Sequence, residues 1–321
     1  MVLIGNDAKT LGIIHYDQNG NPIWINQIYS QPGIEEFGGM CYSDSGYLHI
    51  VGTFLDSVEI VDGDPAVGGS DVFVAQLDGD GNFTWKAFAG STGDDWSNGC
   101  AVNSQGDVYV VGQFENTAAF GQINLTSNGW WDMFIGILDS NGMWTSVMNY
   151  GNNGWESIES IFIDENDNVL VAGTHSRALT LGSDELTDRD GNGAFRDVFI
   201  GQLSNDNQWS WVISGGGSGD DIPVSISLGY NDTPTVGFMY KGTFRIGNLS
   251  LASNGEYDIG IWSYARDQDL DGITDGVDNC PRDFNPDQLD SDGDLEGNLC
   301  DEDDDNDGVA DDWDDCSPGE L

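Results

Sequence analysis

The strongest constraint on the fold of this chain is an internal repeat with a period of 61 to 65 residues. A short apolar run begins five times in the same register, and these runs start at Thr10, Asp71, Asp132, Asp197 and Asp258. Each of the first four runs is followed by a polar turn and a tryptophan, and these tryptophans are Trp24, Trp85, Trp144 and Trp211. A fixed period predicts a row of equivalent structural units that bury apolar faces against one another.

Each repeat has the composition of short β-strands. Runs of Val, Ile, Phe, Tyr and Trp are separated by turn clusters such as Asp-Gly-Asp-Gly and Asn-Asp-Asn. Runs such as Val108–Val111 are continuously apolar, so both faces of their sheets should be buried. About four strands per repeat, stacked on neighbouring repeats, are typical of a propeller blade. We therefore expect an all-β fold over residues 1–266: a β-propeller of four blades if the strand near Asn21–Ile28 closes the last blade, or of five if the N-terminal residues form a partial blade of their own.

The repeats resemble a known family. The pattern Asp-x-Phe-Val-Ala-x-Leu-Asp, followed by Trp and by Asn-Ser-x-Gly-Asp-Val-Tyr-Val-Val-Gly-x-Phe, is similar to the bacterial and archaeal propeller repeats called SBBP. The resemblance covers about Thr10–Arg266 and is closest over Asp71–Phe120. It implies the same propeller fold for this part of the chain.

Acidic residues recur at equivalent positions of the repeats. One set follows the tryptophan segment and comprises Glu36, Asp95, Glu156 and Asp221, preceded in three repeats by Glu35, Asp94 or Asp220. These carboxylates could line a channel and bind a cation or sugar hydroxyls. We favour the alternative that they accept backbone N–H bonds between repeats, since repeat proteins reuse stabilising contacts. The second set, at the strand starts Asp71, Asp132, Asp197 and Asp258, is predicted to stabilise turns.

Features of catalysis and of disulfide bonding are sparse in the repeats. His15, His49 and His175 occupy non-equivalent positions, and no nucleophile elbow or phosphate loop occurs. We therefore predict a protein that is not an enzyme. The alternative is a carbohydrate-active propeller enzyme with the acidic tail as linker, which requires two carboxylates facing one channel mouth. Cys41 and Cys100 are expected to be small buried apolar residues rather than a disulfide.

The charge of the chain divides it into two domains. It has 56 acidic residues against 9 Lys plus Arg, a formal net charge of −47, which argues against nucleic-acid and anionic-membrane partners. From Asp267 to Leu321 there are 22 acidic residues and one base, Arg282. Such a step in composition predicts a boundary, with domains at 1–266 and 267–321. Adaptation to high salt would also explain an excess of acids, although it does not explain how the tail acids are spaced.

The acidic tail contains three calcium-loop frames. The spacing matches an EF-hand-type loop, in which side chains at positions 1, 3, 5, 9 and 12 and the carbonyl at position 7 surround one Ca²⁺, with glycine at position 6. The first frame comprises Asp267, Asp269, Asp271, Ile273, Asp275 and Asp278. The second comprises Asp290, Asp292, Asp294, Glu296, Asn298 and Asp301. The third comprises Asp303, Asp305, Asp307, Val309, Asp311 and Asp314.

The regular phase of these acids favours calcium binding over a disordered, solvated tail. Gly272 and Gly308 occupy position 6 of the first and third frames, whereas Leu295 stands there in the second. The geometry of the second turn is therefore in question. The sequence predicts no flanking amphipathic helices, so an ordinary EF-hand is excluded.

The tail resembles thrombospondin type 3 repeats. The motifs are Asp-x-Asp-x-Asp-Gly-x-x-Asp-x-x-Asp-Asn-Cys-Pro, then Asn-Pro-Asp-Gln, then Asn-Leu-Cys-Asp, from Asp267 to about Pro318. In that family calcium replaces a hydrophobic core and successive cysteines pair, which implies a disulfide between Cys280 and Cys300. Cys316 would then need a partner beyond Leu321. Leu295, Asn298 and Asp315-Cys-Ser depart from the family pattern.

Together these features predict a secreted or cell-surface protein with Ca²⁺ as its cofactor, because calcium loops and disulfides require an oxidising, calcium-rich environment. The propeller would act in adhesion, ligand binding or scaffolding on an irregular, calcium-stiffened stalk. Its expected partner is a glycan or a surface protein, bound by loops such as Glu115–Trp131 and Gly182–Phe195. No signal peptide and no apolar run long enough to span a bilayer are visible, so direct membrane insertion is not expected.

Overall fold

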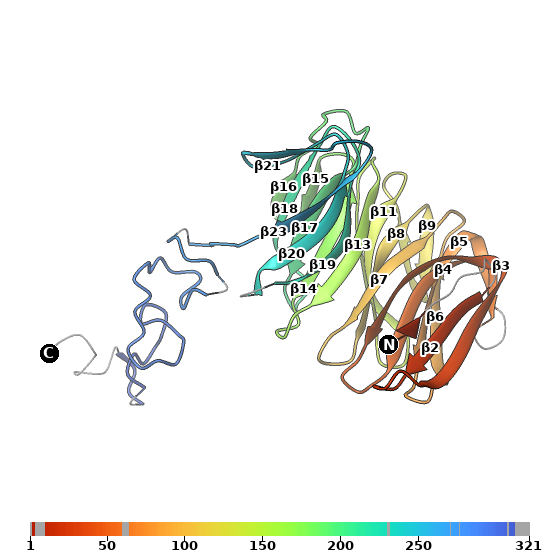
Figure 1. The fold of residues 1–321 in the computed structure, drawn as a ribbon, viewed down its shortest axis with the longest axis horizontal. Helices are drawn as coiled ribbons and strands as arrows, with labels where there is room; N and C mark the ends of the chain where they lie inside the picture. Colours follow the sequence, from red (N-terminus) through yellow and green to blue (C-terminus); the bar gives the residue numbers. More distant parts are fainter. Residues whose placement is uncertain are drawn as a thin grey trace. The chain divides into compact units, whose positions relative to one another are not determined.

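The computed structural model describes residues 2–3, 10–59, 64–229, 232–269, 271–275, 277–306 and 308–311. Every element of regular secondary structure in these ranges is a β-strand, so the all-β prediction is confirmed (Figure 1). The chain divides into two compact units: Met1–Ser227 with Val236–Ile261, called the β unit below, and Leu228–Thr235 with Trp262–Leu321, called the acidic unit.

The first sheet of the β unit has eight strands in the order β1-β2-β3-β4-β5-β6-β9-β10. Their bounds are β1 Val2–Leu3, β2 Thr10–Tyr16, β3 Pro22–Tyr42, β4 Leu48–Glu59, β5 Asp64–Leu77, β6 Phe83–Gly90, β9 Thr117–Phe120 and β10 Ile123–Thr126. β3 belongs to two repeats, because its Pro22–Tyr29 part pairs with β2 and its Tyr29–Tyr42 part pairs with β4.

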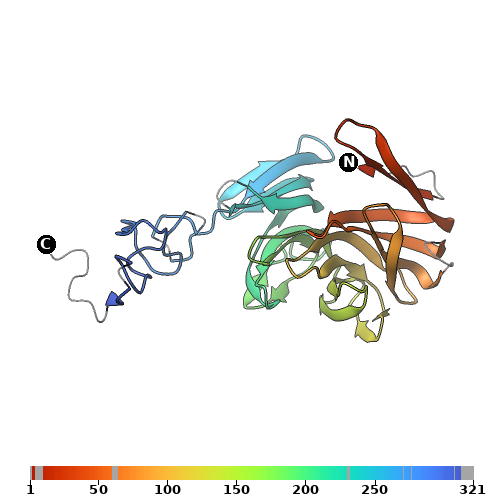
Figure 2. The same ribbon diagram turned by 90° about the horizontal axis from the view of Figure 1, so that it is seen from below.

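The next sheets follow one pattern in which strands adjacent in the repeat are adjacent in the sheet (Figures 1 and 2). One sheet contains β7 Trp96–Val102, β8 Val108–Phe114, β11 Asp132–Leu138 and β12 Trp144–Tyr150. The next contains β13 Glu156–Ile163, β14 Val169–His175, β17 Asp197–Leu203 and β18 Trp209–Gly217. A three-stranded sheet contains β19 Asp221–Leu228, β20 Pro234–Tyr240 and β23 Asp258–Ser263.

Short hairpins between the second and third strands of a repeat reach back to the preceding repeat. The β9–β10 hairpin extends β6 through the pair Ala89–Phe120. The hairpin of β21 (Thr243–Ile246) and β22 (Leu249–Ala252) extends β18 in the same way. A third hairpin, β15 (Leu179–Leu181) with β16 (Asp184–Leu186), forms a two-stranded sheet. The first two hairpins therefore add backbone hydrogen bonds between consecutive repeats.

The core of the β unit lies between its sheets, and adjacent residues of one strand belong to different core clusters. On β8, Val110 packs in a cluster with residues of β5 and β6, while Val111 packs in a cluster with residues of β13 and β14. On β11, Phe134 and Ile135 divide in the same way. The prediction that both sheet faces are buried is thus confirmed for these strands, which explains their continuously apolar sequences.

The strand pairing can be compared with the two predicted propellers, of four and of five blades. The Pro22–Tyr29 part of β3 pairs with β2, and among the described strands β23 pairs with β20 alone. The pairing of this part of β3 with the last sheet, which a four-bladed closure requires, is therefore absent from the described strands. The number of blades stays a prediction.

Candidate calcium-binding segment

The first frame of the acidic unit folds as a loop around three carboxylates. One oxygen from each of Asp267, Asp269 and Asp271 lies within 4.8 Å of the others. The backbone N–H of Asp271 donates to Asp269 Oδ1 (3.1 Å), and that of Gly272 donates to Asp267 Oδ2 (3.1 Å). Gly272 has a φ of +96°, the left-handed conformation that glycine adopts without a steric cost. The predicted turn at position 6 is therefore present.

Several carboxylate oxygens of this loop have no hydrogen-bond partner among the described residues. They are Asp267 Oδ1, Asp269 Oδ2 and Asp278 Oδ2, all shielded from solvent. Desolvation raises the pKa of Asp269, and the charges of Asp271, Asp278 and Asp267 raise it further. Buried, unpaired anionic oxygens are costly unless a cation neutralises them. A hard divalent cation with oxygen ligands fits this donor set.

The side chain at position 9 makes the same contact in all three frames. Asp275 Oδ1 accepts from the N–H of Gln268 (2.7 Å), and Asp275 also pairs with Arg266 (3.5 Å). The equivalent bonds in the other frames run from Ser291 N–H to Asn298 Oδ1 (2.8 Å) and from Asp304 N–H to Asp311 Oδ1 (3.1 Å). One oxygen of this side chain therefore closes the loop on itself.

The second frame folds like the first although it lacks the glycine. Asp290, Asp292 and Asp294 bring one oxygen each within 4.8 Å of one another. Leu295, with a φ of +85°, adopts the left-handed conformation, and its N–H donates to Asp290 Oδ2 (3.3 Å). The N–H of Glu296 donates to Asp294 Oδ1 (2.8 Å), as that of Ile273 donates to Asp271 (2.7 Å). The sequence left this turn in question, and the structure forms it at the steric cost of a leucine with positive φ.

The third frame is described in part. Gly308, with a φ of +93°, donates its N–H to Asp303 Oδ2 (2.8 Å), which repeats the bond between positions 6 and 1 of the first frame. At position 12 of the second frame, Asp301 accepts from the N–H of Asp303 (2.9 Å). The remaining predicted ligands of the third frame within the described residues are Asp305, Val309 and Asp311. Asp307 and Asp314 lie outside the described residues, as does Cys316.

A disulfide between Cys280 and Cys300 connects the first and second frames, as the family resemblance implied. Their Cα atoms lie 5.7 Å apart, and Cys280 is buried. Beside them, Asp278 Oδ1 accepts from the N–H of Cys280 (2.9 Å) and from Gln288 Nε2 (2.8 Å). The small buried centre of this segment is therefore a disulfide with polar groups rather than an apolar core.

In the β unit, the acids that follow the tryptophan segments accept backbone hydrogen bonds. Asp95 accepts from the N–H groups of Ser91 and Glu115, and Glu156 accepts from that of Asn152 (3.0 Å). Asp221 accepts from the N–H of Lys241 (3.3 Å). The structural interpretation is confirmed for these three residues, each at most 1% exposed. Glu36 differs, because its side chain is exposed.

Three of the four acids predicted at strand starts also have the predicted role, since β11, β17 and β23 begin at Asp132, Asp197 and Asp258. Asp132 Oδ2 accepts from the N–H of Asn128, four residues earlier (3.0 Å), and Asp258 Oδ2 accepts from that of Asn254 in the same way (2.9 Å). Asp71 makes this contact with Val67, but it departs from the prediction because both residues lie within β5, which begins at Asp64. Asp197 Oδ2 accepts from the N–H of Arg189, eight residues earlier (2.9 Å). The side chains of Asp132, Asp197 and Asp258 thus stabilise the turn that precedes their strand.

The two sets of acids meet between consecutive repeats as buried pairs. Desolvation raises the pKa of Asp95 to about 7, and the charge of Asp71 adds to the increase. The same causes raise the pKa of Glu156 to about 7 beside Asp132, and that of Asp221 to about 8 beside Asp197. Carboxyl groups of this kind hold protons near neutral pH, which limits the charge buried between the sheets.

The prediction for Cys41 and Cys100 is wrong, because the two residues form a disulfide. Cys41 lies on β3 and Cys100 on β7, the first strands of adjacent repeats, and their Cα atoms are 5.7 Å apart. Equivalent positions in stacked repeats can face each other directly. The sequence showed the equivalence of the two cysteines, but it did not show that they face each other.

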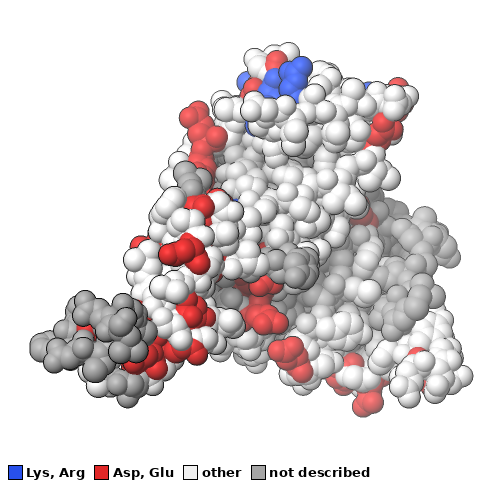
Figure 3. Space-filling view, turned by 60° about the vertical axis from the view of Figure 1, so that its left-hand side comes forward, with Lys and Arg blue, Asp and Glu red and all other residues white. Residues whose placement is uncertain are grey.

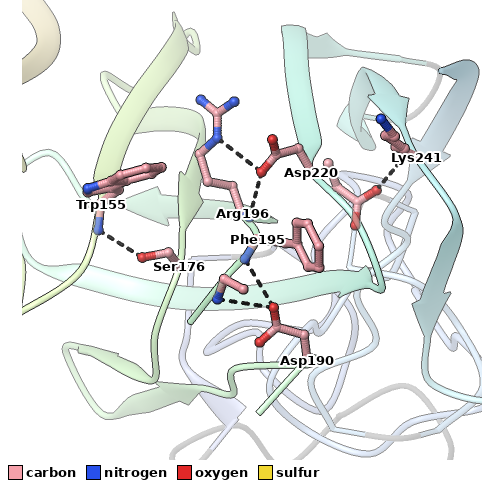
Figure 4. Close-up of polar contacts among 9 residues, drawn as sticks. Trp155, Ser176, Asp190, Phe195, Arg196, Asp220 and Lys241 are labelled. Carbon is pink, nitrogen blue, oxygen red and sulfur yellow. Dashed lines mark hydrogen bonds and ion pairs between the residues drawn. The ribbon is translucent and has the colours of Figure 1, made fainter. Parts of the chain in front are cut away.

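A loop in the β unit has the same form as the acidic frames, and sequence analysis missed it. The N–H of Gly193 donates to Asp188 Oδ2 (2.9 Å), that of Asn192 to Asp190 Oδ1 (2.9 Å), and that of Ala194 to Asn192 Oδ1 (2.9 Å). Asp190 also accepts from the backbone N–H groups of Ala194 (3.2 Å) and Phe195 (3.0 Å), and Figure 4 shows the contact with Phe195. The signal is Asp-x-Asp-x-Asn-Gly. These hydrogen bonds close the loop onto its own side chains.

Comparison with known proteins identifies the acidic unit. Residues 265–288 and 289–318 match the family model of the thrombospondin type 3 repeat. The segment therefore carries thrombospondin type 3 repeats, which are typical of calcium-binding, extracellular proteins. No match was found among curated proteins. In the described residues, no helix has the length and apolar character needed to cross a membrane.

Two solved structures are similar to the chain at low identity. A protein of unknown function from Bacteroides caccae has 12% identity and a TM-score of 0.40, with 80% of this chain and 70% of that chain covered. Hydrazine synthase from Kuenenia stuttgartiensis has 12% identity and a TM-score of 0.37, with 71% of this chain and 62% of that chain covered.

Proposed function

We propose that this is a secreted or cell-surface protein whose acidic unit binds Ca²⁺ and is ordered by it. The observation that carries the proposal is the set of unpartnered carboxylate oxygens in the first frame, on Asp267, Asp269 and Asp278. These oxygens belong to residues at positions 1, 3 and 12 of the loop, where the spacing predicts ligands. Asp271 and the carbonyl of Ile273 complete the proposed ligand set.

The physical argument for calcium is that the segment from Asp267 to Leu321 has too few basic residues to neutralise its acids. Its 22 acids face a single base, and the apolar side chains Phe284, Leu289 and Leu299 are more than half exposed. Self-repulsion and chain entropy both oppose an ordered segment of this composition. Bound Ca²⁺ neutralises the carboxylates, while the Cys280–Cys300 disulfide restricts the unfolded chain.

The location outside the cytoplasm is supported by the same chemistry. Extracellular calcium modules bind with dissociation constants of about 10⁻⁴–10⁻³ M, which suits a calcium-rich medium. The two disulfides, one in each unit, are favoured in an oxidising environment.

For the β unit we propose a β-propeller-type array of four or five blades of the SBBP kind, acting as an adhesion, ligand-binding or scaffold module rather than an enzyme. The meander sheets and the hairpins between repeats support this architecture. The paired carboxylates support a structural role, because Asp95, Glu156 and Asp221 are at most 1% exposed and hydrogen-bonded to the backbone. The acidic unit would serve as the stalk of this module.

A calcium titration by calorimetry on the full chain tests the proposal. We expect two or three saturable sites, of which one is lost in the double variant Asp267→Asn/Asp269→Asn. The matched control, Asp283→Asn/Asp287→Asn, removes the same charge from exposed residues outside the frames and should leave the titration unchanged. Equal losses in both double variants would indicate general charge attraction and would overturn the proposal. A site lost only on Asp188→Asn/Asp190→Asn would move calcium binding to the β unit.

A further inference from the structure

We propose that a cluster of four tryptophans at one edge of the β unit binds a neutral, β-1,4-linked glycan whose ring substituents are all equatorial. The cluster, called the tryptophan corner below, comprises Trp96, Trp130, Trp131 and Trp155. The inference rests on the proposed role of the β unit as a ligand-binding module, and it names the class of ligand.

The fold brings the four indoles together from two adjacent repeats. Trp96 begins β7, Trp131 directly precedes β11, and Trp155 directly precedes β13. β7 and β11 are each antiparallel to β8, so both strands begin at the same end of their sheet, beside the last residues of β8. Trp131 and Trp155 form an isolated parallel bridge, and the N–H of Glu156 donates to the carbonyl of Trp131 (3.0 Å). The loops that carry the indoles are therefore fixed to one another.

Further contacts hold these loops in place. Gly129 lies so close to the neighbouring loop that an added Cβ would clash with the carbonyl of Asn152. The N–H of Trp155 donates to Ser176 Oγ (2.8 Å), as Figure 4 shows. Asn152 in turn donates from Nδ2 to the carbonyl of Ala178 (2.6 Å). The aromatic surface is thus held in place by backbone and side-chain hydrogen bonds before any ligand arrives, which lowers the entropic cost of binding.

The rings form a corner rather than a flat patch. The centroids of Trp130 and Trp155 lie 6.4 Å apart with an angle of 71° between the ring planes. The ring of Trp131 is partly buried, and its centroid lies 6.1 Å from that of Trp155 and 6.4 Å from that of Trp96. Trp130 is 69% exposed and Trp155 is 43% exposed, although large aromatic side chains normally bury most of their surface. Exposed aromatic rings in a pre-formed arrangement mark a ligand site.

Polar atoms without a partner accompany the aromatic surface. Trp96 Nε1, Trp131 Nε1, Asn152 Oδ1 and Glu156 Oε1 are shielded from solvent and have no hydrogen-bond partner among the described residues. Glu156 is 1% exposed, and its Oε1 lies beside Asn152 Oδ1 and Ser176 Oγ around Gly154. The exposed indoles of Trp130 and Trp155 offer flat apolar surfaces, which suit a sugar because its ring faces carry C–H groups. A pyranose ring with only equatorial substituents presents its axial C–H groups to an indole on both faces.

The charge and the exposed residues of the chain favour a neutral glycan over other occupants. With a net charge of −47, the chain repels polyanions, and acidic side chains are spread over the face in Figure 3 while basic ones gather in one place. Exposed aliphatic side chains, which a protein partner would cover, lie elsewhere, on β3, β22 and β23: Ile23, Ile25, Leu249, Leu251, Ile259 and Ile261.

The test is a titration of the full, calcium-loaded chain with cellohexaose and with chitohexaose, followed by tryptophan fluorescence and by calorimetry. We expect saturable binding of at least one hexasaccharide, weakened about tenfold by Trp130→Ala and by Trp155→Ala, because each variant removes one stacking surface. The control Tyr47→Ala, an exposed aromatic residue outside the corner, should bind like the parent chain. A galacturonate hexasaccharide should not bind.

Three results would overturn the inference. The first is no binding of either neutral hexasaccharide at millimolar concentration. The second is binding that survives both tryptophan substitutions or that favours the galacturonate. The third is self-association, measured by light scattering, that Trp130→Ala abolishes, since it would assign the corner to a second copy of the chain. The calcium titration separates this inference from the proposed function, because the tryptophan variants should keep the calcium sites of the parent.

Discussion

The carboxyl group of Asp132, at the start of β11, covers Gly151, the residue after β12, so closely that a Cβ on Gly151 would lie under 3.0 Å from it. The same contact joins Asp71 to Gly90 and Asp197 to Gly216. The glycine is therefore required because the buried acid of the adjacent strand occupies the space of a side chain. This contact links the turn-stabilising acids to the end of the fourth strand in three repeats.

The first prediction concerns this contact. Gly151→Ala should lower the free energy of unfolding by about 2 kcal/mol, because the carboxyl group of Asp132 is held by hydrogen bonds and cannot move aside freely. Gly237→Ala is the matched control, since a Cβ there meets nothing within 4 Å. Urea unfolding followed by tryptophan fluorescence measures both. Equal midpoints for the two variants would show that the contact yields without cost.

The second prediction concerns pH. The pKa values of Asp95, Glu156 and Asp221 are raised to between about 7 and about 8, so the folded state binds their protons more tightly than the unfolded state does. By linkage, their contribution to stability is fully present below pH 4 and is lost as the pH rises toward 8. The β unit should therefore unfold at a lower urea concentration at pH 8 than at pH 6.

Asp221→Asn tests this assignment, because an amide cannot lose the proton that the folded state retains. The variant should show a smaller decrease in the urea midpoint between pH 6 and pH 8 than the parent. Asp258→Asn is the control, since Asp258 also begins a strand but belongs to the other set of acids and is only partly buried. A parent midpoint that rises over this interval would contradict the buried pairs as the dominant titrating groups.

The third prediction concerns the disulfide between repeats. Cys41 and Cys100 are separated by 59 residues, and closing a loop of this length stabilises the folded state by about 4 kcal/mol in the chain-entropy model. The double variant Cys41→Ser/Cys100→Ser should lose a comparable amount. Cys280→Ser/Cys300→Ser provides the control and should leave the unfolding of the β unit unchanged. Peptide mapping without reduction would contradict the assignment if it recovered Cys41 as a free thiol.

The fourth prediction concerns calcium removal. Arg282 is the one basic residue after Arg266, so trypsin has a single site within the acidic segment. Chelation of calcium should increase the rate of cleavage after Arg282, because the segment then loses its order. Since this bond lies within the loop closed by Cys280 and Cys300, the fragments should separate only after reduction. A cleavage rate that is the same with calcium and with chelator would contradict ordering by calcium.

The sequence predicted those features that repeat or follow a fixed spacing. The period and the apolar runs predicted the strands, and the alternation of Val110 and Val111 between two core clusters follows from runs buried on both faces. The spacing of carboxylates predicted the loops around Asp267 and Asp290, which the structure forms. Patterns of this kind are local, so one sequence is enough to reveal them.

Other features depend on contacts between segments that are distant in the sequence. A single sequence does not reveal the relative positions of such segments. The pairing of Cys41 with Cys100 requires that adjacent first strands face each other, and the extension of β6 by β9 requires knowledge of sheet stacking. The tryptophan corner likewise arises from loops of two repeats. Leu295 is a different case, because its positive φ contradicts the local preference of leucine and is imposed by the surrounding loop.

The disulfide of the acidic unit also sets a mechanical limit. If calcium leaves while the chain is under tension, residues on either side of the bridge can extend, but the 20-residue separation between Cys280 and Cys300 stays closed. At the reach of an extended chain, the bridge withholds about 70 Å of contour length. The segment would then lengthen in two stages, one governed by calcium concentration and one by the redox state of its surroundings.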